Sequence, residues 1–430
     1  MSVFSCSIGV MWNTEDIRLL RSGPSNEVYK RIFLYSSWLL YWIARCCNFL
    51  KLRYNSHSRR LEHTQYNIII TKLILTVKCL FLLRHIVDYM VIGFVIWIHL
   101  FRVEKADGQN FLISLAMQGI SINVLRRIVI FLHSQEDCRL IKQLVNEIIY
   151  ISRTIESKFG MIYHCEFSLL GLYLCKMYLV YLIMETMWYK PYFLWINLFY
   201  WILMEYCEFA YFLYQLILLN WYRNLSFFLQ SLTEYHETLE FISRHYHRRL
   251  LLLFKVHLRI IKLHKYIKEK VAWLPSAIYL GIFTSIFNME LLLECMIYAQ
   301  DDIENKMYII ADGCLGPALV PLLNVLILGI CTDRLRSVEL TLQQQIVIIN
   351  IQYIRKAYQH DNTLKVLHNE HTSLIVHQKL EPLLNEIVFG MICDREFAFD
   401  YFLTVMITAL SFIQYTVSTN RNVAECVSHK

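Results

Sequence analysis

Long apolar stretches recur along this chain and limit its fold more than any other feature. A helix that crosses a bilayer needs about 20 predominantly apolar residues, whereas strands of a membrane β-barrel show alternating segments of roughly 10 residues. The stretches here are continuous, with 56% of the 430 residues hydrophobic and 18% charged. The sequence therefore predicts an all-α integral membrane protein with seven transmembrane helices. They are Tyr66 to Ile98, Phe111 to Leu132, Phe167 to Trp188, Tyr192 to Trp221, Val271 to Tyr298, Met307 to Cys331 and Phe397 to Val417.

An eighth apolar block, Ile32 to Leu50, precedes these stretches. It contains Arg45 and is flanked by Lys30, Arg31 and Lys51. Charges at such positions are typical of a helix that lies in the plane of the membrane interface. We expect an interfacial or re-entrant helix here, with a full membrane span as the alternative.

The distribution of lysine and arginine predicts the orientation, because cytoplasmic loops retain positive charge. Alternate gaps between the spans hold thirty basic residues on one side and six on the other. This places the N-terminus in the cytoplasm and the C-terminus outside. The chain then divides into a cytoplasmic N-terminal region with the interfacial helix (1–65), a six-helix transmembrane domain (66–331), a cytoplasmic linker (332–396), the last transmembrane helix (397–417) and an extracellular tail (418–430).

Motifs of catalysis are missing from the sequence. It holds no Gly-rich phosphate loop, HExxH, GxSxG or Cys-x-x-Cys motif, and its thirteen cysteines are scattered. The net charge of +7 is spread over all predicted cytoplasmic gaps instead of forming one stripe with aromatic platforms. We therefore expect no enzyme activity, no cofactor, no metal and no nucleic-acid partner; the lipid bilayer is the surrounding medium.

The segment Arg244 to Lys270 combines apolar residues at helical spacing with many bases. It reads as a cytoplasmic extension of the flanking spans or as a contact with anionic lipid, with a calmodulin target as a further alternative. His257 and His264 lie seven residues apart in it, which predicts a wetted helix face rather than a metal site.

Acidic residues inside the predicted spans favour a cavity. Glu205 and Glu208, and likewise Glu290 and Glu294, are spaced three or four apart, so each pair faces one way on its helix. Carboxylates are costly at membrane depth, and a water-filled cavity or a ligand cation would explain them. Proximity to the outer headgroups is the alternative for Glu294.

Aromatic residues gather around the short outer gap between the third and fourth spans. Trp188, Tyr192 and Trp195 belong to this group. Tryptophan and tyrosine favour membrane interfaces in general, so an aromatic belt is one interpretation. The other is an aromatic-walled ligand pocket that opens outward.

Seven spans suggest a G-protein-coupled receptor, yet the orientation is inverted and the characteristic motifs of that class are missing. The end of the last span instead resembles the insect gustatory receptors, whose signature is Thr-Tyr, five apolar residues and Gln-Phe. Here the stretch is ITALSFIQY from Ile407 to Tyr415, in which Gln414 matches and Tyr415 replaces Phe. Gly390 and Asp394 before this span, and the basic turn near residues 58–60, also resemble the family.

The resemblance implies a ligand-gated cation channel of four subunits, identical or mixed, in the plasma membrane, with the last helix lining the pore. Thr404, Ile407, Ser411 and Gln414 form one helical stripe and are the predicted pore-lining residues. Ser411 stands where the family usually has an apolar residue, so Leu410 or Ile407 closes the pore or closure is looser.

The resemblance also implies a small-molecule tastant, for which a cationic bitter compound is one candidate. The predicted ligand site, on the outer halves of spans two to six, comprises Trp188, Tyr192, Trp195, Glu205 and Glu290. Two alternatives stay open. One is a multi-span transporter, since Pro317 and Pro321 interrupt the sixth span. The other is a non-conducting partner subunit of a receptor complex.

Overall fold

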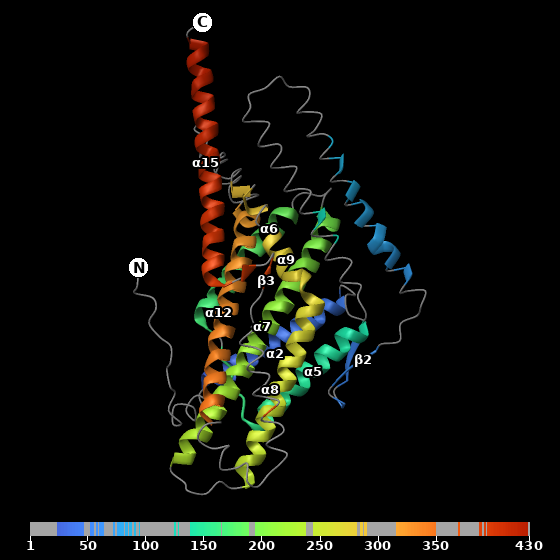
Figure 1. Cartoon of the computed structure of the whole chain (residues 1–430). Helices are drawn as coiled ribbons and strands as arrows, with labels where there is room; N and C mark the ends of the chain where they lie inside the picture. The colour runs from blue at the N-terminus through green and yellow to red at the C-terminus, as the bar shows by residue number, and fades with distance from the viewer. Residues whose placement is uncertain are drawn as a thin grey trace.

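The computed structural model of this chain is dominated by long helices that run side by side (Figure 1). The residues that the structure describes are 24–46, 52–55, 57–58, 60–63, separate positions in 72–94 and 124–128, 138–164, 166–188, 194–237, 244–281, 284–286, 288–289, 315–349, 369, 387–388, 391–392 and 394–428.

Three helices form the centre: α6 (Phe167–Trp188), α7 (Leu194–Glu237) and α12 (Leu315–Ile349). Each contains a stretch long and apolar enough to cross a membrane, at Ser168–Glu185, Ile202–Ser231 and Leu315–Val347. The first of these lies within the predicted third span, and the other two overlap the predicted fourth and sixth spans but end farther along the chain. The seven-span count and the orientation stay predictions, because most of the first two predicted spans lies outside the described residues.

Segments expected to be cytoplasmic linkers fold into a helical bundle with a large apolar core. The C-terminal halves of α7 and α12 pack there with α5 (Cys138–Lys158) and α8 (Arg244–Val271). Trp221, Phe254 and Leu342 are buried at the centre of this core. Because α8 buries its apolar face here, that face is not available to calmodulin in the folded chain.

The expectation of a wetted histidine face on α8 was wrong. His257 is 0% and His264 5% exposed. The His264 Nδ1 atom lies 3.0 Å from the hydroxyl of Tyr214, and the His257 ring meets Tyr222 edge to face. His257 and His264 therefore face α7 rather than solvent, because α8 turns its apolar side inward and these two residues lie on that side.

Two buried asparagines of α7 hold the connection between α5 and α6 in place. Asn224 accepts a hydrogen bond from the N–H of Ile162 (2.6 Å) and donates one to its carbonyl (2.8 Å). Asn220 does the same for His164, at 2.8 and 3.1 Å. A connection without helix or strand bonds leaves its backbone groups unpaired, and side-chain amides satisfy them. Burial, together with the charge of Arg223, lowers the pKa of His164.

The N-terminal part forms a helix followed by a hairpin. Helix α2 (Pro24–Cys46) occupies the block expected to be interfacial or re-entrant, and it exposes Trp38 and Trp42 while burying Phe33. Strands β1 (Leu52–Asn55) and β2 (Arg60–His63) pair antiparallel, with Asn55 opposite Arg60. The Asn55 side chain accepts the N–H of His57 at 2.9 Å, which closes the turn.

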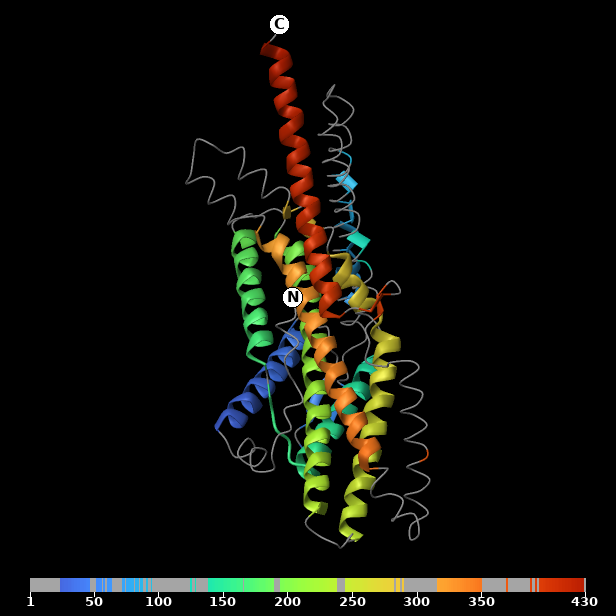
Figure 2. The same ribbon diagram turned by 60° about the vertical axis from the view of Figure 1, so that its left-hand side comes forward.

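The last helix, α15 (Arg395–Ser428), follows the two-residue strands β3 (Ile387–Val388) and β4 (Met391–Ile392) and extends beyond the other helices towards the C-terminus (Figures 1 and 2). Asp394 caps its start by accepting the N–H of Phe397 at 2.9 Å. The start of α15 lies close to the backbone of α12 at Gly329. A Cβ atom on Gly329 would lie 2.7 Å from the Asp394 carbonyl oxygen and 2.8 Å from the Ala398 side chain. A glycine at this position of α12 allows that packing.

The prolines do not break the sixth predicted span. Helix α12 runs continuously from Leu315 to Ile349, with Pro317 in its first turn and Pro321 inside it. Transmembrane helices tolerate proline where neighbouring helices re-satisfy the freed carbonyl. The fifth predicted span begins with α9 (Trp273–Leu280), which packs against α12 and α15.

Candidate functional site

A buried ionic cluster joins the three central helices. The Nζ atom of Lys176, on α6, lies 2.8 Å from Glu205 Oε2 and 3.0 Å from Glu208 Oε2, both on α7. The Asn324 amide, on α12, donates to Glu208 Oε2 at 2.6 Å. Lys176 is 2% and Glu208 4% exposed. We refer to Lys176, Glu205, Glu208 and Asn324 as the ionic cluster.

The ionic cluster gives the acidic pair of α7 a cation from within the protein. A three-residue spacing turns Glu205 and Glu208 to one helix face, as the sequence predicts, and α6 places Lys176 against that face. A buried charge costs several kcal/mol unless it is paired. Lys176 offsets one of the two negative charges and the Asn324 amide donates to Glu208, so part of the compensation expected from a ligand cation comes from the chain itself. The signal that sequence reasoning missed was a lysine in the middle of an apolar span.

An apolar groove of about 370 Å³ borders the ionic cluster between α2, α6 and α7. Pockets for small ligands commonly measure about 300–1,000 Å³ and are lined by apolar and aromatic side chains with a few polar groups. Glu205 and Tyr173 contribute to the lining, and the Tyr173 ring stacks on Phe212 with centroids 4.8 Å apart. The groove therefore offers an aromatic wall beside a carboxylate.

Glu205 is the one member of the predicted ligand site whose side chain the structure describes. Trp188 is the last residue of α6 and Trp195 the second of α7, but their side chains lie outside the described part. Tyr192 and Glu290 also fall outside it. The aromatic residues found near Glu205 are instead Tyr173, Tyr206, Phe209 and Phe212, which the sequence did not single out.

The predicted pore stripe lies on the face of α15 that points away from the protein's own packing. Thr404, Ile407, Ser411 and Gln414 are all exposed, with Ile407 at 60%. Val405 and Ala409 are buried against Ala318 and Leu322 of α12. The stripe is thus exposed in the single chain, opposite the side of α15 that packs against α12.

Two acidic residues continue this stripe towards the start of α15. Asp400 and Glu396 are exposed and precede Thr404 by one and two helical turns. The Thr404 hydroxyl donates a hydrogen bond to the backbone carbonyl of Asp400 at 2.7 Å. The hydroxyl therefore has a partner within the helix even where its surroundings are apolar. The exposed face of α15 therefore runs from carboxylates at its N-terminal end to an amide, Gln414, farther along.

Known proteins resemble this chain in sequence and in fold. Gustatory receptor-like 43a of Drosophila melanogaster is 48% identical over 430 residues, which is 100% of both chains. The solved structure of an insect olfactory receptor from Machilis hrabei in complex with eugenol has a TM-score of 0.56 at 9% identity, and covers 89% of this chain and 99% of that chain. This likeness concerns the fold alone. No protein-family model matches the sequence.

Proposed function

Because this chain belongs to the insect gustatory receptor family, we propose that it is a chemoreceptor that acts as a subunit of a ligand-gated cation channel. Four subunits, identical or mixed with related receptors, surround the pore in the plasma membrane. A small-molecule tastant opens it. The observation that carries this proposal is the exposed polar stripe of α15 opposite its packed face.

A polar stripe on a membrane helix needs water or protein around it, because an unpaired polar group in hydrocarbon costs several kcal/mol. Several copies of α15 arranged around an axis would turn their stripes towards a shared aqueous path. Ile407 is the large apolar side chain among the four predicted pore-lining residues and would form a constriction that excludes water in the closed state. Ser411, one turn beyond, would keep the path above it polar.

The apolar groove beside the ionic cluster supports the tastant part of the proposal. Its volume suits a small organic molecule, and Glu205 could accept a hydrogen bond from an amine or hydroxyl of such a ligand. A cationic bitter compound fits this chemistry. Trp188, Tyr192, Trp195 and Glu290 stay part of the proposed ligand site.

Current recording from cells that express the full chain tests the pore. Gln414→Ala and Ser411→Val should shift the reversal potential or the basal current, because both change the polarity of the proposed pore wall. Tyr178→Phe, on the exposed face of α6, serves as the control and should leave currents unchanged. Unaltered permeation in both α15 variants would count against a pore-facing stripe.

Expression alone and together with related receptors separates a conducting subunit from a non-conducting partner. A current that requires a second receptor, but still responds to the α15 variants, identifies a subunit of a mixed channel. For a transporter, broken helices near mid-membrane are expected. Helix α12 is not broken at Pro321, so it lacks the interruption that a transporter would be expected to have there.

A further inference from the structure

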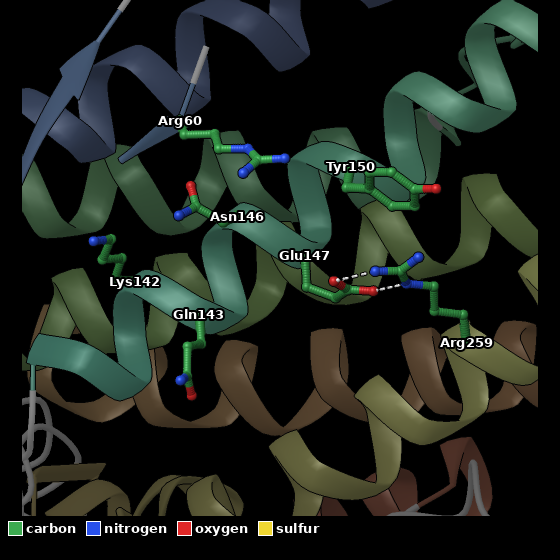
Figure 3. Close-up of a pocket in the computed structure, with 7 residues that line it drawn as sticks. All are labelled: Arg60, Lys142, Gln143, Asn146, Glu147, Tyr150 and Arg259. Atoms are coloured by element: carbon green, nitrogen blue, oxygen red, sulfur yellow. Dashed lines mark hydrogen bonds and ion pairs between the residues drawn. The ribbon is translucent and has the colours of Figure 1, made fainter. Parts of the chain in front are cut away.

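An open cleft of about 580 Å³ lies between β2, α5 and α8, away from both the groove and the α15 stripe (Figure 3). Its volume falls in the range of about 300–1,000 Å³ seen for small-ligand sites. We call it the basic cleft. Its lining residues are Arg60, Lys142, Gln143, Asn146, Glu147, Tyr150 and Arg259.

The basic cleft carries a net charge of about two positive units, from three cations and one carboxylate. Glu147 already binds Arg259 through both carboxylate oxygens. Among the described residues, the side chains of Arg60 and Lys142 have no hydrogen bond and no ion pair within 4.0 Å. The carboxylate of Glu62, in the hairpin, accepts hydrogen bonds from Asn55 and Ser58, which together with the charge of Lys142 lower its pKa. With Glu62 counted beside the lining residues, about one net positive charge remains for a ligand.

The cleft is pre-organised by contacts between its three elements. Asn146 of α5 accepts the N–H of Leu61 at 2.7 Å and donates to its carbonyl at 3.2 Å, which fixes β2, and with it the neighbouring Arg60. The Arg259 guanidinium lies 4.0 Å from the centroid of the Tyr150 ring. In Figure 3, Arg60 and Arg259 approach the region around Glu147 from opposite sides. These contacts hold the β2 backbone that carries Arg60, and the Arg259 guanidinium, in place before a ligand binds, which lowers the ordering cost of binding.

Chain connectivity keeps this cleft near a membrane surface. Helix α5 ends at Lys158, and the apolar stretch of α6 begins at Ser168. Tyr150 precedes the end of α5 by eight residues, or about 12 Å of helix. Val145 of α5 and Tyr206, which lies within the apolar stretch of α7, pack against the same small cluster of buried residues. The distribution of basic residues predicts that the N-terminal end of α6 is cytoplasmic, where anionic lipids are concentrated.

We propose that the basic cleft binds the phosphorylated inositol headgroup of a lipid in the cytoplasmic leaflet. A phosphomonoester carries about −1.5 to −2 charge at neutral pH and offers three acceptor oxygens, which suits the guanidinium of Arg60 and the ammonium of Lys142 in one cleft. Guanidinium groups bind phosphate oxygens in pairs. The exposed amide of Gln143 can donate to a further phosphate oxygen or an inositol hydroxyl. This site goes beyond the proposed channel function and does not depend on it.

Binding to the purified full-length protein in detergent tests the proposal, with a fluorescent short-chain phosphatidylinositol bisphosphate as the probe. The double variant Arg60→Gln/Lys142→Gln should raise the Kd for this probe about thirtyfold, because each basic residue contributes roughly fivefold in affinity. The control Lys262→Gln/Lys265→Gln removes the same charge from exposed positions of α8 outside the cleft and should change Kd by less than about threefold. Melting curves of both variants show whether they remain folded.

Competitors identify the source of the phosphate. Short-chain phosphatidylserine should compete poorly, and vesicles with phosphatidylinositol bisphosphate should bind the protein more tightly than vesicles of equal charge made with phosphatidylserine. Equal loss of affinity in the two double variants would overturn the proposal, since binding would then follow overall charge. Binding of soluble inositol trisphosphate without binding of the vesicles would overturn the assignment to a lipid.

Discussion

Replacing Lys176 by methionine should destabilise the folded chain strongly. Methionine approximates the length of lysine but leaves Glu205 and Glu208 without the ammonium group that lies 2.8 and 3.0 Å from them. Breaking a buried ion pair by removing one partner costs about 3–5 kcal/mol. With an unfolding entropy of roughly 2.1 cal/mol/K per residue, a chain of 430 residues should lose about 3–6 °C in melting temperature.

Thermal melting of the detergent-purified protein, followed by its size-exclusion profile, measures this loss. Lys158→Met makes the same substitution at an exposed position of α5 and should shift stability by no more than about 0.5 kcal/mol. Adding Glu205→Gln and Glu208→Gln to Lys176→Met removes the unpaired charges and should recover most of the loss. If Lys176→Met melts like Lys158→Met, the cluster does not carry paired charges in the folded protein.

Three further predictions concern other parts of the chain. Gly329→Ala should cost about 1–3 kcal/mol because its new Cβ would lie 2.8 Å from the Ala398 side chain, whereas Gly171→Ala, with nothing within 4 Å, should be neutral or slightly stabilising in the same melting assay. His164 has a pKa below its ordinary value of about 6.5, so the stability it contributes is present above that pH and is lost as pH falls through its folded pKa. Melting between pH 7.5 and 5 should therefore depend less on pH in His164→Gln, and parallel curves would refute the assignment. Asp400→Asn should lower the permeability ratio of cations to anions if the acidic end of the α15 stripe faces the pore, and an unchanged reversal potential in a salt gradient would argue against it.

The helices themselves were largely predictable. The predicted third span, Phe167 to Trp188, has the bounds of α6, because continuous apolar sequence marks a membrane helix directly. The lengths of α7 and α12 were underestimated, since their C-terminal halves leave the most apolar stretch and continue into the bundle with α5 and α8. There, partner helices stabilise the helix rather than local hydrophobicity.

For the candidate site, the sequence predicted which side chains share a helix face, but not which side chains of other helices they contact. The common face of Glu205 and Glu208 and the stripe through Thr404 and Gln414 both follow from helical periodicity. That Lys176 would meet the carboxylates does not, because it belongs to another helix and its position depends on how α6 and α7 pack.

What the sequence determined by itself is the membrane class, the approximate helix positions and the polarity of each helix face, all of which depend on residues close together in the chain. The tertiary structure decided which faces meet. It turned the acidic pair of α7 into an ionic cluster, buried His257 and His264, and left the polar stripe of α15 exposed. These outcomes depend on contacts between residues far apart in sequence, where the fit of whole helices, such as that of α15 against Gly329, decides which pairs come together.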